Sequence, residues 1–230
     1  MQNNSKISIV VTYLPLSEEV DIMTIKCLDL IHDNTLNEHE VIVVSNGMAR
    51  ESFLAGIKYD CDIIELPQNN GNAYAWDRGV STAQSDMVIL MDNDVFVEKD
   101  WDKDMIERLS ENGVGVSFPY SILETDDYRS KQYRGRRDGF CFALKKETYS
   151  KAGPFLKDQP FHSYYEDDAF FAEVQLNLGL KLVACEGSKV FHRGQGTTKS
   201  IWNKEIEDGI NKNKEWFENK YNKQYPYLTK

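Results

Sequence analysis

Short apolar runs rich in β-branched residues alternate with segments of helical spacing through the first half of the chain. The runs predict strands at residues 7–13, 41–44, 61–66, 87–91 and 113–118. Between them, helical spacing predicts helices that begin at Ser17, at Gly71 and near Trp101. This order predicts parallel strands with right-handed crossovers, and therefore an α/β fold with a mostly parallel central sheet and helices on both faces.

The alternation of apolar runs and helical segments stops after Pro119. Residues 120–138 are polar and predict a loop. The remaining pattern predicts a strand at 140–144, a helix at 168–178, short strands at 181–185 and 188–192, and an amphipathic helix at 201–221. No repeat or low-complexity linker divides the chain. We therefore expect one α/β domain over residues 1–196, with a helical extension over 197–230 packed on it.

The residues that follow the strands are the first candidates for chemistry, because ligands bind at the carboxyl ends of parallel strands. Asp92, Asn93 and Asp94 leave a buried strand together. Alternate residues project to the same side, so both carboxylates can face one cation. Hard ions such as Mg²⁺ or Mn²⁺ prefer such oxygens. The alternative is an ordinary turn, in which Asp and Asn are common.

Two later segments carry further reactive groups. Glu166, Asp167 and Asp168 follow two tyrosines at the start of a predicted helix. A carboxylate there can act as a general base, although the helix dipole alone also favours acids at this position. His192 ends a predicted strand, where a neutral imidazole either completes a metal site or serves a structural role.

A basic segment, residues 129–137, holds five cations and no acid. It is either a solvated loop or a flap that meets phosphate or an acidic acceptor. The flap interpretation gives a role to Arg134, Arg136 and Arg137, and it is favoured by the contrast with the acidic chain around them.

Composition narrows the classes of function. With 27 basic and 37 acidic residues the 230-residue chain has a net charge of −10, which argues against a whole-surface binder of nucleic acid. No apolar run approaches the roughly 18 residues of a membrane span, and we see no signal peptide. The four cysteines are widely spaced, which predicts free thiols in a reducing compartment. We expect a cytoplasmic protein, soluble or peripheral to the inner face of a membrane.

Taken in order, these segments resemble the inverting glycosyltransferases of family 2, which have the GT-A fold. The resemblance covers residues 6–196. Residues 7–13 look like the family's first strand, whose end, here Thr12 and Tyr13, holds the nucleotide base. Residues 40–47 look like its second strand, although the family usually has Asp where Ser45 stands.

Other donor contacts are implied by the same resemblance. Asn46 ends the second strand, and Asn70 and Gly71 look like part of the segment that passes the diphosphate. Residues 75–79, with Arg78, look like its continuation, but the family often has Arg-Asn where this chain has Trp-Asp at 76–77.

The triplet at 92–94 matches the Asp-x-Asp motif of the family. By that likeness Asp94 binds Mn²⁺ or Mg²⁺, and Asp92 helps to hold the metal, the ribose or the sugar. Asn93 is placed with the donor. His192 matches the C-terminal metal histidine.

Glu166-Asp167 matches the motif whose Asp is the base, and Gly139 begins a segment like the family's strand on the acceptor side. The resemblance implies a single displacement with inversion, in which Asp167 deprotonates the acceptor hydroxyl. Asp168 is an alternative base, and Glu166 orients the acceptor or the base. The donor is a nucleotide-diphosphate sugar, a UDP-sugar being favoured. The acceptor is a glycan, a lipid-linked sugar, a protein or another polymer.

Two rival classes of function remain at this stage. A nucleotidyltransferase shares the sheet and the metal carboxylates but needs a glycine-rich, basic loop after the first strand, where this chain has Tyr-Leu-Pro-Leu-Ser at 13–17. A non-catalytic nucleotide- or sugar-binding module is compatible with Ser45 and Trp76. The set of Asp94, Asp167 and His192 disfavours it.

Overall fold

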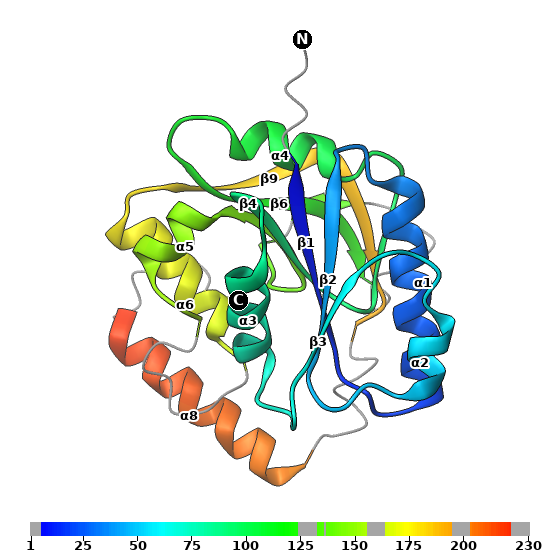
Figure 1. Ribbon diagram of the computed structural model, residues 1–230. Helices are drawn as coiled ribbons and strands as arrows, with labels where there is room; N and C mark the ends of the chain where they lie inside the picture. The colour runs from blue at the N-terminus through cyan, green and yellow to red at the C-terminus, as the bar shows by residue number, and fades with distance from the viewer. Residues whose placement is uncertain (1–5, 124–132, 136, 156–163, 195–202, 222–230) are drawn as a thin grey trace.

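The computed structural model describes residues 6–123, 133–135, 137–155, 164–194 and 203–221. Within them one mixed sheet has the strand order β3-β2-β1-β4-β8-β6-β9-β5, with β7 paired to β6 (Figure 1). The strands are β1 (Ile7–Tyr13), β2 (His39–Ser45), β3 (Asp62–Glu65), β4 (Met87–Asp92), β5 (Val95–Val97), β6 (Val114–Leu123), β7 (Arg134–Gly135), β8 (Cys141–Lys145) and β9 (Lys181–His192). The helices are α1 (Glu18–Asn34), α2 (Glu51–Gly56), α3 (Asn72–Thr82), α4 (Asp102–Leu109), α5 (Lys146–Ala152), α6 (Glu166–Ala172), the π-helix η1 (Glu173–Asn177) and α8 (Lys204–Tyr221).

The first four strands of this order confirm the predicted crossovers. Strands β3, β2, β1 and β4 run parallel to one another. Strand β8 runs antiparallel to β4 and β6, whereas β9 is parallel to β6. The far edge is formed by β5, which is antiparallel to β9. The predicted α/β fold is therefore confirmed, with an antiparallel part that the sequence pattern did not indicate.

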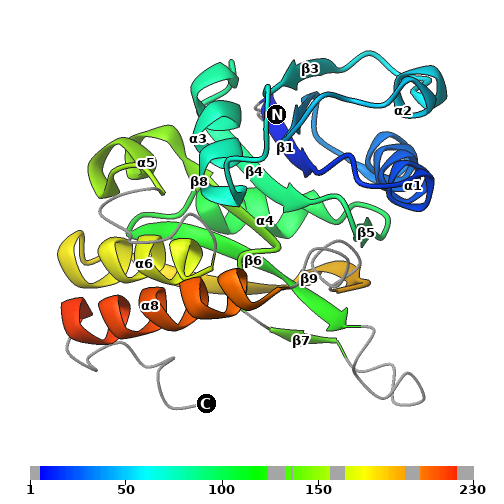
Figure 2. The same ribbon diagram turned by 90° about the horizontal axis from the view of Figure 1, so that it is seen from below.

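Helices cover both faces of the sheet (Figure 2). Side chains of α1, α2 and α4 pack with one set of strand residues, and those of α3, α5, α6 and α8 pack with the other set. The alternation is clear in β1, where Ile9 and Val11 belong to the first core and Val10 to the second. A strand buried on both faces needs apolar residues at successive positions, which explains why its sequence is a continuous apolar run.

The predicted loop over 120–138 is wrong in part. Strand β6 continues to Leu123, and β7 pairs with it through Tyr120 and Ser121. The same two residues also pair with β9 on the other side. Their backbone groups are therefore satisfied as in an interior strand, whatever the polarity of the side chains.

Other elements also differ from the predictions. The two short strands predicted at 181–185 and 188–192 form the single strand β9, whose pairing with β6 shifts between Cys185 and Lys189. Helix α6 begins two residues earlier than predicted, at Glu166, and continues as the π-helix η1. Elements α2, β5 and α5 were not predicted, because each is too short to show a period.

A buried carboxylate ties the start of α1 to the end of β1. Asp21 is 1% exposed and accepts hydrogen bonds from the hydroxyl of Tyr13 (2.5 Å), Nε of Arg50 (2.9 Å) and Oγ of Ser52 (2.6 Å). The ring of Tyr13 also stacks on Phe53 of α2, with centroids 4.3 Å apart. These contacts fix the end of β1 against the segment that follows β2, and both lie at the edge of the sheet where ligands are expected.

We predict that Tyr13→Phe lowers the free energy of unfolding by about 1.5–3 kcal/mol, because a buried carboxylate loses one of its donors. Urea denaturation of both proteins measures this loss. Tyr74→Phe is the matched control, since Tyr74 is 37% exposed. Equal losses in the two variants would contradict a special role for the bond between Tyr13 and Asp21.

Candidate active site

Asp92 lies where the carboxyl ends of β1 and β4 meet. It is paired with Thr12 in the parallel register, and Oγ1 of Thr12 donates to Oδ1 of Asp92 over 3.3 Å. The amide of Asn72, the first residue of α3, donates to the same oxygen over 3.3 Å. Two neutral donors from different elements therefore hold this carboxylate at the end of the sheet.

The two residues after Asp92 point in opposite directions. Asn93 is 5% exposed, and its amide donates to Oγ1 of Thr24 on α1 over 2.7 Å. Asp94 lies close to Asp92, because residues 93–94 form the turn that separates β4 from β5. Strand β5 begins at the next residue, Val95, which pairs with His192 of β9. This pairing brings the histidine to the two carboxylates.

Asp92, Asp94 and His192 form a group whose potential ligand atoms all lie within 4.8 Å of one another. Burial, followed by the charge of Asp94, raises the pKa of Asp92, although His192, Asn72 and Thr12 oppose the shift. Two carboxylates this close repel each other, and a cation would relieve that repulsion. Carboxylate oxygens and an imidazole nitrogen are also the donors that Mn²⁺ accepts. The residues present therefore fit a divalent metal ion.

The ring of His192 is held on two sides. Its Nε2 lies 3.1 Å from Oδ1 of Asp94, and the ring stacks on Phe140 with centroids 4.1 Å apart. Burial lowers the pKa of His192, but the hydrogen bond to Asp94 and the charges of Asp94 and Asp92 outweigh burial, so the pKa is raised. The next residue, Arg193, donates its backbone N–H to the carbonyl of Asp94 over 3.0 Å, which extends the antiparallel pairing of β5 and β9 by one residue.

Asp167 lies against the backbone of Gly139. Its Oδ2 accepts the N–H of Gly139 over 3.0 Å. A Cβ atom at position 139 would lie 2.4 Å from the same oxygen, so only glycine fits without a shift of Asp167. Burial raises the pKa of Asp167, and the charge of Asp138 adds to the shift.

Glu166 is the most buried acid of this segment. It is 5% exposed, and its Oε2 has no hydrogen-bond partner in the part of the chain that the structure describes. Burial raises the pKa of Glu166 well above its usual range, and the charges of Asp167 and Asp92 add to this. Asp168 is half-buried on the same first turn of α6. The three acids thus begin one helix, as the sequence indicated, with different exposures.

The predicted donor residues around β2 form a tight turn. Oδ1 of Asn46 accepts the N–H of Asn70 over 2.8 Å, and its Nδ2 donates to the carbonyl of Gly71 over 2.9 Å. Gly71 has a φ of 84°, which favours glycine, and α3 begins at the next residue. Asn46 therefore holds in place the segment that leads into α3 and to the contact between Asn72 and Asp92.

The side chains of three predicted donor residues lie elsewhere. Tyr13 is 1% exposed and its hydroxyl bonds to Asp21, while Asn93 bonds to Thr24. Arg78 is exposed on α3, six residues after Asn72, which corresponds to about 9 Å of helix rise. The structure brings none of these three side chains to the Asp92 group. Tyr13 packs in the core, Asn93 binds Thr24 of α1, and Arg78 lies on the exposed surface of α3.

The positions at which the chain departs from the family pattern have local roles. Oγ of the buried Ser45 donates to the carbonyl of Gly47 over 2.7 Å and closes the turn after β2. Trp76 is 2% exposed and packs edge-on against Phe142, with centroids 5.5 Å apart. Asp77 accepts from the backbone N–H of Phe155 over 3.0 Å. These residues stabilise the turn after β2 and the core.

The basic segment is described only in part. Arg134 is exposed on β7, and Arg137 is half-buried just before Gly139. Arg136 and residues 129–132 lie outside the described residues. The described end of the basic segment therefore lies on β7, beside β6.

Three contacts in the site were missed at the sequence level. Asn72 binds Asp92, Phe140 covers His192, and Asp138 is near enough to raise the pKa of both Asp167 and His192. Asn72 had a local signal, since it is a polar residue that starts a helix directly after Gly71. The other two contacts join segments far apart in sequence, and no local pattern marks them.

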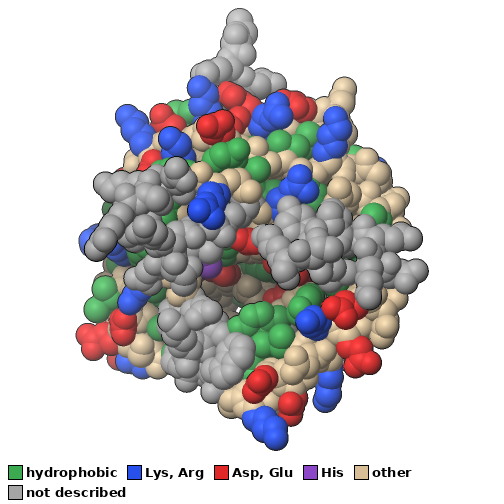
Figure 3. Space-filling model, turned by 180° about the vertical axis from the view of Figure 1, so that it is seen from behind, with side chains coloured by type: hydrophobic (Ala, Val, Ile, Leu, Met, Phe, Trp, Pro, Cys, Tyr) green, Lys and Arg blue, Asp and Glu red, His purple; other side chains and the backbone are tan. Residues whose placement is uncertain are grey.

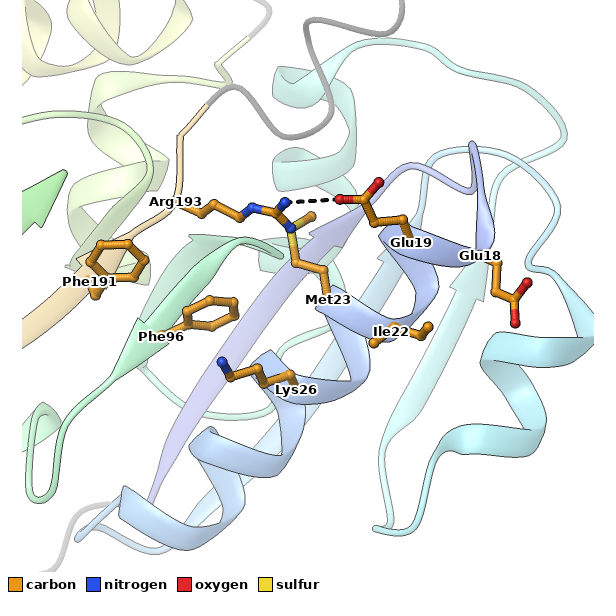
Figure 4. A pocket seen from close by; sticks show the side chains of 8 residues that line it. All are labelled: Glu18, Glu19, Ile22, Met23, Lys26, Phe96, Phe191 and Arg193. Carbon is orange, nitrogen blue, oxygen red and sulfur yellow. Dashed lines mark hydrogen bonds and ion pairs between the residues drawn. The ribbon is translucent and has the colours of Figure 1, made fainter. Parts of the chain in front are cut away.

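The surface over this region is hollowed. In Figure 3, acidic side chains and a histidine are visible at a hollow near the middle of the face that is turned away from the viewer of Figure 1. A separate pocket of about 580 Å³ lies between α1 and the last strands, where Phe96 and Phe191 stack with centroids 6.0 Å apart (Figure 4). These rings point to the opposite side of β5 and β9 from Val95 and His192. The pocket is thus distinct from the group of Asp92, Asp94 and His192, although Arg193 lines it.

No helix in the described part of the chain is long and apolar enough to cross a membrane.

Known proteins resemble the chain in sequence pattern and in fold. The sequence model of glycosyl transferase family 2 matches residues 23–170. Mannosyltransferase PcManGT from Pyrobaculum calidifontis, in complex with GDP-Man and Mn²⁺, has a TM-score of 0.67 and 16% identity over 87% of this chain and 60% of that chain. GalNAc-T7 with UDP, GalNAc and Mn²⁺ has a TM-score of 0.64 and 12% identity over 82% of this chain and 43% of that chain. Among curated protein sequences none matches the chain.

The two structures share the fold at low identity, and the chain spans less than two thirds of the length of either. The match to the family pattern covers most of the chain and includes the triplet at 92–94 and the acids at 166–168. The protein therefore has the GT-A fold that its sequence resembled, and it belongs to glycosyl transferase family 2.

Proposed function

We propose that the chain transfers a sugar from a nucleotide-diphosphate sugar to an acceptor hydroxyl, with inversion and with dependence on Mn²⁺ or Mg²⁺. The observation that carries this proposal is the group of Asp92, Asp94 and His192 at the carboxyl ends of the strands of a family 2 chain. The two similar structures each contain Mn²⁺ with a nucleotide or a nucleotide sugar, which supports the choice of metal and donor class.

The three residues of this group would hold the metal ion. Bound there, a divalent ion supplies positive charge to the diphosphate leaving group. The protein's part is to keep the donors in place. Thr12 and Asn72 hold Asp92, and Phe140 fixes the ring of His192. We infer that Asp94 binds the metal directly, and that Asp92 binds the metal, the ribose or the sugar.

Asp167 is the proposed base. Its Oδ2 is held by the N–H of Gly139, and its raised pKa makes it a stronger proton acceptor than an exposed carboxylate. Burial raises the pKa of Glu166 well above the usual range, which favours its protonated form, and a protonated carboxyl can donate a hydrogen bond to the acceptor or to Asp167. Asp168 is the alternative base, and we favour Asp167 because it is the acid that accepts the N–H of Gly139.

The donor is proposed to lie along the turn that Asn46 holds at Asn70 and Gly71. Backbone groups of this turn replace side-chain contacts that the buried Trp76 cannot make. A UDP-sugar is our first choice of donor. Arg134, Arg136 and Arg137 are proposed to meet the diphosphate or the acceptor, on the side that Gly139 lines.

The acceptor is proposed to be a glycan, a lipid-linked sugar, a protein or another polymer. We place the reaction in the cytoplasm, which is supported by cysteines that are free thiols in the structure, three of them buried.

A panel of nucleotide sugars tests this function. Each is added with and without Mn²⁺, and thermal stability and consumption of the donor are measured. A donor at 100 times its dissociation constant is expected to raise the melting temperature by about 5–10 °C, only with metal. Binding without consumption would instead indicate a non-catalytic module, and release of pyrophosphate from a nucleoside triphosphate would indicate a nucleotidyltransferase.

We predict that Asp94→Ala abolishes metal-dependent binding of the donor while the protein remains folded, because this carboxylate lies at a strand end outside the apolar core. Thermal shift with Mn²⁺ and the donor measures the loss. Asp62→Ala, which removes an exposed acid from β3, is the control and keeps the shift. Full turnover of Asp94→Ala in the presence of a chelator would refute the metal assignment.

We predict that Asp167→Asn lowers turnover by about 10²–10⁴-fold, since the amide cannot accept the acceptor's proton. Affinity for the nucleotide stays near that of the wild type, because the diphosphate is bound at the metal. Steady-state kinetics and nucleotide titration separate the two effects. Asp168→Asn is measured in parallel. A loss of turnover in Asp168→Asn alone would identify Asp168 as the base. Normal turnover of both variants would indicate that the acidic run only begins a helix and supplies no base.

A further inference from the structure

The turn before α6 has an unusual backbone. Tyr164 and Tyr165 are consecutive residues with φ values of 66° and 68°. Side chains with a Cβ disfavour this left-handed region, and it is rarest for bulky residues. Tyr165 is also the residue that precedes Glu166, and its side chain makes no capping hydrogen bond. Such a turn persists only where surrounding contacts hold it.

The first of these contacts comes from α8. Asn213 lies in the middle of this helix and is 0% exposed. Its Nδ2 donates to the carbonyl of Tyr164 over 2.8 Å. A fully buried amide is costly unless it is hydrogen-bonded, so the bond favours the conformation in which the Tyr164 carbonyl faces α8.

Aromatic packing continues the contact along both helices. The ring of Tyr165 packs on Phe217 with centroids 5.6 Å apart, and Phe217 packs on Tyr221 with centroids 4.8 Å apart. The hydroxyl of Tyr221 lies 3.3 Å from the carbonyl of Ala169 and 3.0 Å from Oε1 of Glu173. Helix α8 therefore contacts α6 from the turn at its start to the π-helix at its end, and Figure 2 shows the two helices side by side.

We propose that α8 positions the acids of α6, and that Asn213 is a positioning residue that keeps Asp167 at Gly139 by holding the left-handed turn. This inference rests on the proposed function, because it specifies how the proposed base, Asp167, is oriented. The alternative is that α8 only covers apolar surface and stabilises the fold. The two alternatives differ in whether turnover or stability responds to loss of the amide.

The test is Asn213→Ala. Turnover is expected to fall by about 10–100-fold, because a displacement of about 1 Å in a catalytic group has effects of this size. The KM for the donor and the metal-dependent nucleotide affinity are expected to stay within about twofold of the wild type. Asn211→Ala, at an exposed position of the same helix, is the matched control. A lower melting temperature with unchanged turnover in Asn213→Ala would overturn the proposal.

A second substitution adds a rescue. Glycine adopts positive φ without strain, so Tyr164→Gly should restore the turn when the amide of Asn213 is missing. The double variant is expected to regain at least about tenfold of the lost turnover. If Tyr164→Gly restores nothing, Asn213 does not act through the turn and the proposal fails. Should Asn213→Ala not fold, Asn213→Ser, which keeps a shorter donor, is measured in the same way.

Hydrogen exchange keeps the positioning test independent of the proposed function. Amides of α6 in Asn213→Ala are expected to exchange at least about tenfold faster than in the wild type, while those of β1 and β4 do not change. If the wild type transfers no sugar from any donor, the proposed function fails, and the exchange rates still decide whether Asn213 holds the turn. Unchanged exchange in α6 would overturn the positioning role.

Discussion

The short connection between β4 and β5 constrains the rest of the site. Only Asn93 and Asp94 join these strands, so β5 must begin within about 10 Å of the end of β4. Yet β4 lies inside the sheet and β5 at its far edge, with β8, β6 and β9 between them in the strand order. The sheet must therefore bend until β9 passes across the carboxyl end of β4. That bend is what brings His192 to two carboxylates 98 to 100 residues earlier in the chain.

The group assembled by this bend is electrostatically unfavourable for the protein by itself. Burial raises the pKa of Asp92, Glu166 and Asp167, and neighbouring carboxylates add to each shift. Acids gathered in this way cost stability, which other parts of the fold must offset. Asp21 differs from these acids. It is 1% exposed, but three donors satisfy it and it stabilises the fold.

Local patterns were enough to predict the first half of the fold and the core of the site. The apolar runs marked the parallel strands, and the spacing of Asp92 and Asp94 indicated that both could face one cation. In the structure a turn at residues 93–94, and not an extended chain, brings these carboxylates together. The amide of Asn93, which the resemblance assigned to the donor, donates to Thr24 of α1. What local patterns could not supply was contact between distant segments. Gly139 fits against Asp167, and Asn213 donates a hydrogen bond to Tyr164. Both contacts depend on how distant helices and strands are placed, which a short stretch of sequence does not indicate.

The position of β9 in the sheet also has a consequence for synthesis. In the described part of the chain, β5 pairs only with β9, so residues 95–97 have no strand partner until residues 190–192 exist. At about 5–20 residues per second, a ribosome needs about 5–20 s to make the intervening segment. During that interval the nascent chain carries an unpaired strand next to two acids that have no histidine beside them. The parallel half of the sheet can form first, and the group of Asp92, Asp94 and His192 is completed only after β9 has been inserted between β6 and β5.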